Sequence, residues 1–237
     1  MRLLAERQRH RAIGGNALRA AVLGANDGLV SNFSLVMGVA GADSSGAAIV
    51  IAGFAGLLAG ALSMALGEWL SVQSARELYA NQIRVEAAEL AADPDEEEQE
   101  LREIYERKGV PAAVAAEIAS HIIAGDQAVA LDTLVREELG IDPDELGGSA
   151  WVAAGTSFLL FTVGAIIPLM PFIFMTGVSA IALSAVLAGL ALFAVGAGIT
   201  YVTGRSIWVS GTRQLAFGLA AAAITFGIGR LVGVAIA

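Results

Sequence analysis

One unbroken helical pattern constrains the fold of this chain more than any other feature. Residues 49–70 read IVIAGFAGLLAGALSMALGEWL, an apolar run long enough to cross a lipid bilayer as one helix. After this run the sequence contains no Pro or Gly until Pro94, so the same helix is predicted to continue from the membrane into water. Of the 237 residues, 56% are hydrophobic, more than is usual for a soluble domain. The sequence therefore predicts an all-α integral membrane protein.

Four further apolar segments complete the predicted membrane part. They cover residues 18–41, 151–174, 178–201 and 215–237. With residues 49–70, the sequence therefore predicts five transmembrane helices. The intervening segment GRSIWVSGTRQ is predicted to be the loop between the fourth and fifth spans. The predicted organisation is a basic leader at 1–17, two spans within 18–70, an acidic helical domain at 71–148 and three spans within 149–237.

The acidic insert separates the second span from the third. Between residues 71 and 147 there are nineteen Asp and Glu against six Lys and Arg, whereas the rest of the chain holds four acids and eight bases. Asp93-Pro94, followed by three acids, is typical of a helix start, and further helices are predicted at 111–125 and 126–140. Such an insert would repel nucleic acid, which we therefore exclude as a partner.

Basic residues indicate the orientation in the membrane. Thirteen of the fourteen Lys and Arg lie in the N-terminal segment, the acidic insert or residues 204–214, which five spans place on one side. By the positive-inside rule, the N-terminus and the insert are predicted to be cytoplasmic and the C-terminus to be outside. One Lys against thirteen Arg, with heavy use of Ala and Gly, favours a bacterial protein of the inner (plasma) membrane.

Three side chains within the first two spans indicate a cation path. Asp27 shares a helical face with Ser31 and Ser34, and an acid at mid-span costs about 2.5–3.5 kcal/mol on insertion scales. Met64 and Glu68 lie one turn apart in the second span. A thioether beside carboxylates favours transition metals such as Fe²⁺ over Mg²⁺ or Ca²⁺. The sequence thus predicts that a divalent cation crosses the membrane here.

Each of these residues also has a structural interpretation. Asp27 could be a hydrogen-bonded structural acid, paired with Asn26, Asn32 or a neighbouring serine. Glu68 could be a solvated acid at the membrane boundary. Met64 could fill a gap in the packing, as methionine commonly does.

Closely spaced glutamates mark the acidic insert. Two pairs at i, i+3 spacing lie on adjacent predicted helices joined by a short turn, Glu86 with Glu89 and Glu97 with Glu100. Clustered carboxylates repel one another unless a cation intervenes, so these pairs predict a metal site. The folded domain could add further glutamates to it, namely Glu103, Glu106, Glu137 and Glu138. The alternative is a solvated acidic face.

Common signatures of enzymes are missing from the sequence. It has no G-x-x-x-x-G-K-[ST] motif, no H-E-x-x-H motif and no arrangement of a nucleophile beside a base. It contains no cysteine, which excludes disulfides, thiol catalysis and Cys-ligated zinc. We therefore expect a protein that is not an enzyme and that holds no permanently bound cofactor.

Two long motifs resemble those of the vacuolar iron transporter family. They read GANDGLVSNFSLVMGVAGA at residues 24–42 and GFAGLLAGALSMALGEWLSVQS at residues 53–74. The similarity continues through REELG at 136–140, TVGAIIPLMP at 162–171 and RQLAFGLAAAAITFGIGRLVG at 213–233. The resemblance covers nearly the whole chain from Leu18 onward.

This resemblance implies a homodimer of five-span subunits that moves Fe²⁺, and often Mn²⁺, out of the cytoplasm in exchange for protons. The residues that match the family's membrane path are Asp27 and Met64. The residues that match the metal-binding glutamates of its cytoplasmic domain are Glu86, Glu89, Glu97, Glu100 and Glu138. Where some members carry adjacent methionines, this chain has Leu134-Val135, which removes soft ligands and weakens the expectation of an iron preference there.

The expected function is therefore proton-coupled export of Fe²⁺ or Mn²⁺, with the glutamates of the insert capturing the metal. Glu68 and Met64 are expected to pass the metal to Asp27, whose protonation then releases it. Two alternatives stay open. The protein could be a membrane-anchored metal buffer or sensor whose spans only hold the acidic domain, or it could transport a different divalent metal.

Overall fold

The computed structural model describes residues 16–42, 45–142 and 148–236, and its regular elements are all α-helices. The all-α class expected from the sequence is therefore confirmed. The chain divides into two compact units, a bundle unit (residues up to Trp69 and from Ala150 onward) and an acidic unit (Leu70–Ser149). Most of the predicted leader at 1–17, and residues 143–147 at the end of the predicted acidic domain, lie outside the described residues.

The bundle unit contains α2 (Asn16–Gly41), the first part of α3 (Gly46–Ala92), α7 (Ala150–Phe174), α8 (Gly177–Thr203) and α9 (Ile207–Ile236). Among the described residues, four helices are long and apolar enough to cross a membrane, namely α3, α7, α8 and α9. Helix α2 is not among them, because Asn26, Asp27 and Asn32 lower its hydropathy. The five-span count therefore stays a prediction.

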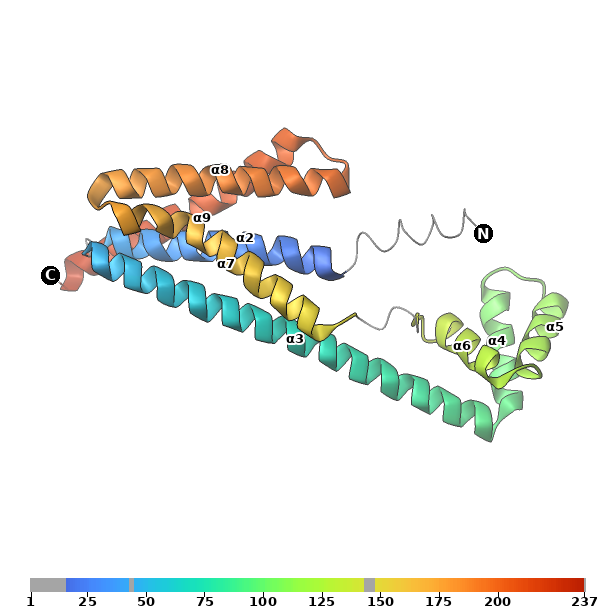
Figure 1. The fold of residues 1–237 in the computed structure, drawn as a ribbon. Helices are drawn as coiled ribbons and strands as arrows, with labels where there is room; N and C mark the ends of the chain where they lie inside the picture. Colours follow the sequence, from blue (N-terminus) through green and yellow to red (C-terminus); the bar gives the residue numbers. More distant parts are fainter. Residues whose placement is uncertain (1–15, 43–44, 143–147, 237) are drawn as a thin grey trace. The chain divides into compact units, whose positions relative to one another are not determined.

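Helix α2 is nevertheless the element around which the bundle unit packs (Figure 1). It lies against α7, α8 and α9, and its Leu29, Phe33 and Val36 are almost completely buried. They belong to one apolar core that also includes Leu169 of α7 and Leu192 of α8. Of the polar residues of α2, Asn32 is buried among the neighbouring helices and Asn26 and Asp27 are partly buried, whereas Ser31 is exposed.

Glycines allow α2 to approach its neighbours at backbone distance. A Cβ added to Gly28 would overlap the backbone carbonyl of Phe161 in α7, and one added to Gly164 would overlap the carbonyl of Ala25. Gly229 of α9 stands in the same relation to the backbone of α2. Such close crossings are how helices gain packing energy within a membrane, where burial from water is absent.

Helix α3 packs on the bundle in a different way, through a row of glycines that receive side chains. The side chains that occupy the places of the missing Cβ atoms are Leu169 at Gly53, Leu35 at Gly56 and Phe161 at Gly60. Leu57 and Ala61 of α3 are buried beside Phe161 and Ala165. The face that α3 turns away from the bundle is apolar and exposed, as at Leu58, Leu62 and Leu66.

One expectation about the last three helices is corrected. Helix α9 begins at Ile207 rather than near Leu215, so the predicted loop shrinks to residues 204–206. Helix α7 contains Pro168 and Pro171 and continues through both. The hydroxyl of Ser184 in α8 donates a 2.7 Å hydrogen bond to the Pro168 carbonyl, so this carbonyl is satisfied inside the bundle.

The acidic unit is formed by the second part of α3, α4 (Pro94–Arg107), α5 (Ala112–Ile123) and α6 (Gln127–Glu137). The predicted helix starts are present: Asp93 accepts a 3.2 Å hydrogen bond from the Glu96 amide, and Asp126 caps α6 in the same way. A small core holds the helices together, and it consists of Leu90, Leu101, Ala119, Ala130 and Leu134.

Candidate metal sites

A cavity of about 420 Å³ lies between α2 and α3 in the bundle unit, and we call it the bundle pocket. The residues that line it are Asp27, Ser31, Asn32, Leu35, Gly56, Gly60, Ser63, Met64, Gly67, Glu68 and Phe161. Its polar groups include two carboxylates and a thioether, and none of the described side chains that line it is basic. The pocket therefore brings together Asp27, Met64 and Glu68, the three residues that the sequence singles out in the first two predicted spans.

Asp27 enters the pocket from α2. Its Oδ1 accepts a 2.9 Å hydrogen bond from the Ser31 hydroxyl one turn later, as their i, i+4 spacing allows. The amides considered as partners bond elsewhere: Asn26 Oδ1 accepts from Gln214 Nε2, and Asn32 Nδ2 donates to the Ala165 carbonyl. Of the partners that the sequence suggested for Asp27, Ser31 is the one that bonds to it. This bond uses Oδ1, so Oδ2 of Asp27 is available to a ligand.

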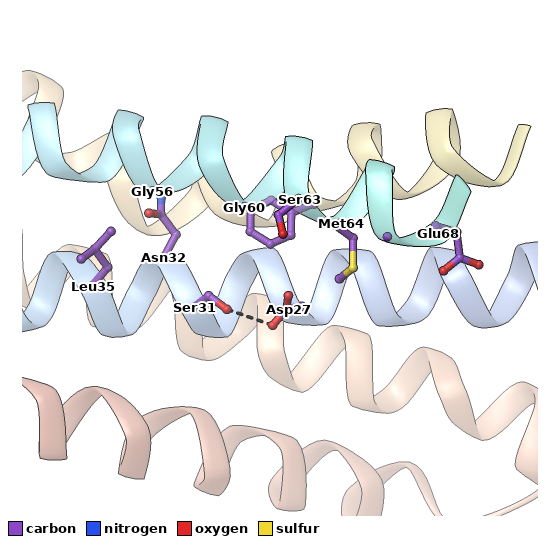
Figure 2. Close-up of a pocket in the computed structure, with 11 residues that line it drawn as sticks. Asp27, Ser31, Asn32, Leu35, Gly56, Gly60, Ser63, Met64 and Glu68 are labelled. Atoms are coloured by element: carbon purple, nitrogen blue, oxygen red, sulfur yellow. Dashed lines mark hydrogen bonds between the residues drawn. The ribbon is translucent and has the colours of Figure 1, made fainter. Parts of the chain in front are cut away.

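Met64 and Glu68 enter the pocket from α3, one turn apart on the same face (Figure 2). Figure 2 shows Glu68 at one end of the pocket, Met64 opposite Asp27, and Asn32 with Leu35 beside Gly56 at the other end. Both Met64 and Glu68 are half-buried. A cation in this pocket would therefore meet carboxylate oxygens and one sulfur atom in succession.

A pair of tryptophans lies next to Glu68. The rings of Trp69 in α3 and Trp151 in α7 are 5.8 Å apart between centroids and are inclined by 58°. Tryptophan is typical of the membrane–water boundary, where its apolar ring and polar N–H are both accommodated. By this rule, the end of the pocket that holds Glu68 is expected to lie nearer to that boundary than the end that holds Asn32.

A second candidate site lies in the acidic unit and is formed by Glu86 of α3, Glu97 of α4 and Glu138 at the end of α6. Each of these three residues, which we call the glutamate trio, offers a carboxylate oxygen within 4.8 Å of the other two. Glu86 is 2% exposed and Glu97 is 5% exposed, whereas Glu138 is exposed. One oxygen of Glu86 and one of Glu97 are buried and have no hydrogen-bond partner within the described part of the chain.

Burial and mutual repulsion favour the protonated forms of the trio. Burial, followed by the charges of neighbouring carboxylates, raises the pKa of Glu86 to about 7 and the pKa of Glu97 to about 7. The pKa of Glu138 is also raised, by burial first and then by the charges of Glu100 and Glu89. A divalent metal held among these carboxylates would compensate their charges.

The other predicted glutamates divide into two groups. Glu89 and Glu100 are exposed and act on the trio through their charges, as their influence on its pKa values shows. Glu103, Glu106 and Glu137 do not join the cluster, and this possibility was wrong. They instead pair with bases, Glu103 with Arg107, Glu106 with Arg102 and Glu137 with Lys108.

Sequence reasoning missed the role of Asn32 in the pocket, where it was considered only as a partner of Asp27. Its side chain is almost completely buried, and its Oδ1 has no hydrogen-bond partner among the described residues. The signal available in the sequence was weak, because a single Asn in an apolar helix has many explanations. Only the packing of α2 against α7 and α3 distinguishes them.

Sequence comparisons relate this chain to one family of known proteins. The sequence model of the VIT family matches residues 18–230. The chain is 30% identical to vacuolar iron transporter 1 of Eucalyptus grandis, over 98% of this chain and 92% of the relative. It is 36% identical to the vacuolar iron transporter of Acanthamoeba castellanii, over 94% and 82%, and 31% identical to vacuolar iron transporter 1 of Arabidopsis thaliana, over 92% and 87%. These relatives are named as transporters and not as enzymes.

Proposed function

The chain belongs to the VIT family, and from that premise we propose that it exports Fe²⁺ or Mn²⁺ from the cytoplasm in exchange for protons. The expectation that it is not an enzyme is confirmed by the transporters to which it is related. We assign it to the bacterial plasma membrane, with its N-terminus and acidic unit in the cytoplasm and its C-terminus outside. The distribution of basic residues and the composition support this assignment.

The observation that carries the proposal is the meeting of Asp27, Met64 and Glu68 in one pocket between two helices of the bundle. Carboxylates within a membrane helix are costly and face functional cavities when they occur. A thioether among them favours a transition metal over Mg²⁺ and Ca²⁺. A pocket with this ligand set and no basic lining residue attracts a divalent cation and repels anions.

Metal passes along the pocket in steps that its residues define. Glu68, beside the tryptophan pair, receives the cation, and Met64 together with Asp27 holds it between α3 and α2. Proton coupling follows from the same oxygens, because a carboxylate that holds a proton cannot hold the metal with equal strength. Protons that arrive from the outside displace the cation from these carboxylates. The protons then move into the cytoplasm, opposite to the direction of the metal.

The acidic unit captures metal before transport. The glutamate trio provides three converging carboxylates, and Glu89 with Glu100 adds negative charge beside it. Carboxylates alone bind Mn²⁺ and Fe²⁺ without strong discrimination. Since Leu134-Val135 adds no sulfur ligand, selectivity for iron rests on Met64 in the bundle pocket.

We propose a homodimer as the functional unit, as the family resemblance implies. The exposed apolar face of α3, with Leu58, Leu62 and Leu66, offers a surface that a second copy can cover. The small residues of α3 remain directed at the bundle and the pocket.

Flux measurements on the full chain in proteoliposomes test this function. We expect Fe²⁺ under anaerobic conditions and Mn²⁺ to cross the membrane, each to compete with the other, and an opposing pH gradient to accelerate both. A protein that binds metal but carries none across the membrane would instead be a buffer or sensor. Flux of another divalent metal with no competition from Fe²⁺ or Mn²⁺ would assign the transporter a different substrate.

A further inference from the structure

The buried side-chain amide of Asn32 has a hydrogen-bond partner for its nitrogen and none among the described residues for its oxygen. The residue is 2% exposed, and its Nδ2 donates a 2.6 Å hydrogen bond to the Ala165 carbonyl, which joins α2 to α7. Its Oδ1 is buried and has no hydrogen-bond partner among the residues that the structure describes. A buried acceptor without a partner is costly, and native proteins retain one where a ligand, an ion or water completes it.

The unpaired oxygen lies at the wall of the bundle pocket. Asn32 lines this pocket beside Gly56 of α3 (Figure 2), and a Cβ placed on Gly56 would lie 3.0 Å from Oδ1. Because Gly56 has no side chain, Oδ1 and the side chain of Leu35 both fit beside its Cα atom, and Oδ1 meets no polar group of the described residues there. Leu35, whose side chain lies against Gly56, bounds the pocket beyond it.

Asn32 follows Asp27 by five residues, about 7.5 Å along an α-helix. Figure 2 shows the order along the pocket as Glu68, then Met64 with Asp27, then Ser31, then Asn32 with Gly56. The amide of Asn32 therefore lies deeper than the carboxylates, near the end that Leu35 bounds. An ion that leaves Asp27 in this direction passes Ser31 and then reaches Asn32.

We propose that Oδ1 of Asn32 is a further metal ligand of the bundle pocket, a neutral oxygen that receives the divalent cation after Asp27. This inference rests on the proposed function and adds a position to its path. A neutral amide oxygen holds a divalent cation less strongly than a carboxylate does. Passage requires sites that bind well enough to admit an ion and weakly enough to release it. The amide of Asn32 would bind the ion weakly enough to release it at the end of the pocket. The hydrogen bond from Nδ2 to the Ala165 carbonyl of α7 fixes the orientation of this amide.

Exchange of the ligand atom tests the role of Asn32 because it changes metal preference, which a structural role would not change. In Asn32→Cys, a soft sulfur replaces a hard oxygen, and soft ligands favour Cd²⁺ over Mn²⁺. We expect the ratio of Cd²⁺ flux to Mn²⁺ flux of the full chain in proteoliposomes to rise at least about tenfold, since even residues that only support metal ligands affect affinity by about 10–100-fold.

Ser157→Cys is the matched control. Ser157 of α7 is 1% exposed and its hydroxyl is also buried with no partner among the residues described, but it does not line the bundle pocket. The same new sulfur at this position should leave the flux ratio unchanged. If Asn32→Cys lowers both fluxes by the same factor, or leaves the ratio at the parent value, Asn32 only ties α2 to α7 and the proposal is overturned.

A second variant keeps the test decisive if Asn32→Cys does not fold. Asn32→Asp replaces the neutral oxygen with a charged one, so the metal should be held more tightly and released more slowly. We expect both the KM and the maximal rate of Mn²⁺ transport to fall, whereas an unchanged KM would contradict a ligand role. Absence of any metal flux in the parent protein is a separate result, and it would overturn the proposed function itself.

Discussion

Gly28 of α2 lies directly against the backbone carbonyl of Phe161 in α7, where a Cβ would overlap the carbonyl oxygen. The reciprocal contact places Gly164 of α7 against the carbonyl of Ala25. These two glycines fix how closely α2 and α7 cross. Asp27 is adjacent to this crossing in the sequence, so the backbone contact also fixes the position of its carboxylate.

Gly28→Ala should destabilise the bundle unit. The new methyl group meets backbone atoms, which cannot rotate away, so we expect a loss near the upper end of the about 1–3 kcal/mol typical of overpacking. Thermal unfolding of the purified protein in detergent measures the loss. Gly155→Ala in α7 is the control, because nothing lies within 4 Å of its new Cβ. A Gly28→Ala protein as stable as this control would show that the helices can move apart freely.

Asp27→Asn should reduce metal flux to the level of empty liposomes while the thermal stability of the protein stays close to that of the parent. The amide keeps the shape of the side chain and can still accept the Ser31 hydrogen bond, but it loses the charge. Ser31→Ala is the control, since it removes that bond and keeps the carboxylate, and it should retain most of the flux. Undiminished flux in a well-folded Asp27→Asn protein would exclude this carboxylate from the path.

Met64→Leu should weaken Fe²⁺ transport more than Mn²⁺ transport. The substitution nearly conserves volume, so packing changes by less than about 1.5 kcal/mol, but the sulfur ligand is lost. Mn²⁺ depends more on oxygen ligands and should be less affected. Met37→Leu tests the packing effect alone, because Met37 is buried in the core of the bundle unit away from the pocket. Equal loss for both metals in Met64→Leu would assign Met64 to packing.

Replacement of both Glu86 and Glu97 by Gln should abolish metal-induced stabilisation of the acidic unit. A ligand that binds only the folded state stabilises it by about 2.7 kcal/mol at 100 times its Kd, so Mn²⁺ should protect the parent against unfolding and the variant should gain little. Half-saturation of transport should also rise, with maximal flux partly retained. Glu103→Gln with Glu106→Gln is the control, because these glutamates pair with Arg107 and Arg102.

The raised pKa values predict that metal-free protein loses stability in the acidic unit as the pH rises. For Glu86 and Glu97 the pKa is about 7 in the folded state against 4.5 as the ordinary value, so the folded state holds protons that the unfolded state releases. Their contribution to stability is complete below pH 4.5 and is lost as the pH rises through about 7. Denaturation of the metal-free full chain at pH 5 and pH 8 measures this trend.

Metal affinity should change with pH in the opposite direction. Protons and metal compete for the trio, so Mn²⁺ should bind more tightly at pH 8 than at pH 5.5 and should release protons near pH 6–7. Calorimetry in buffers of different ionisation enthalpy counts the protons released. An affinity that does not depend on pH across this range would place the metal away from Glu86 and Glu97.

The long helix α3 was predictable because its length and its lack of Pro and Gly after the apolar run leave no other reading. The start of α9 was not, because Gly204 and Gly211 indicate a loop. In the structure only Gly204, with φ of 65°, ends a helix, whereas Gly211 lies inside α9 and receives the ring of Phe193. The contact of Phe193 with Trp208 then orders the segment that the sequence pattern assigns to a loop.

In the candidate sites too, residues that are unusual within their own helix could be predicted, whereas residues that depend on contacts far apart in the sequence could not. Asp27, Met64 and Glu68 stand out because each is unusual within its own helix. The pairing of Glu86 with Glu97 follows from a short turn, but the approach of Glu138 depends on how α6 returns to α3 and α4. Asn32 depends on Ala165, more than a hundred residues away, and no local pattern indicates such a partner.

Helix α2 is synthesised before α7 and α9, which hold the partners of two of its amides. Asn32 finds its acceptor in α7 and Asn26 finds its donor in α9, so neither amide has this partner when α2 leaves the ribosome. An amide without a partner is costly in lipid, and α2 is not apolar enough to offset that cost alone. The predicted insertion of α2 into the membrane therefore depends on the C-terminal half of the chain, and a nascent chain that stops before α7 should insert α2 poorly.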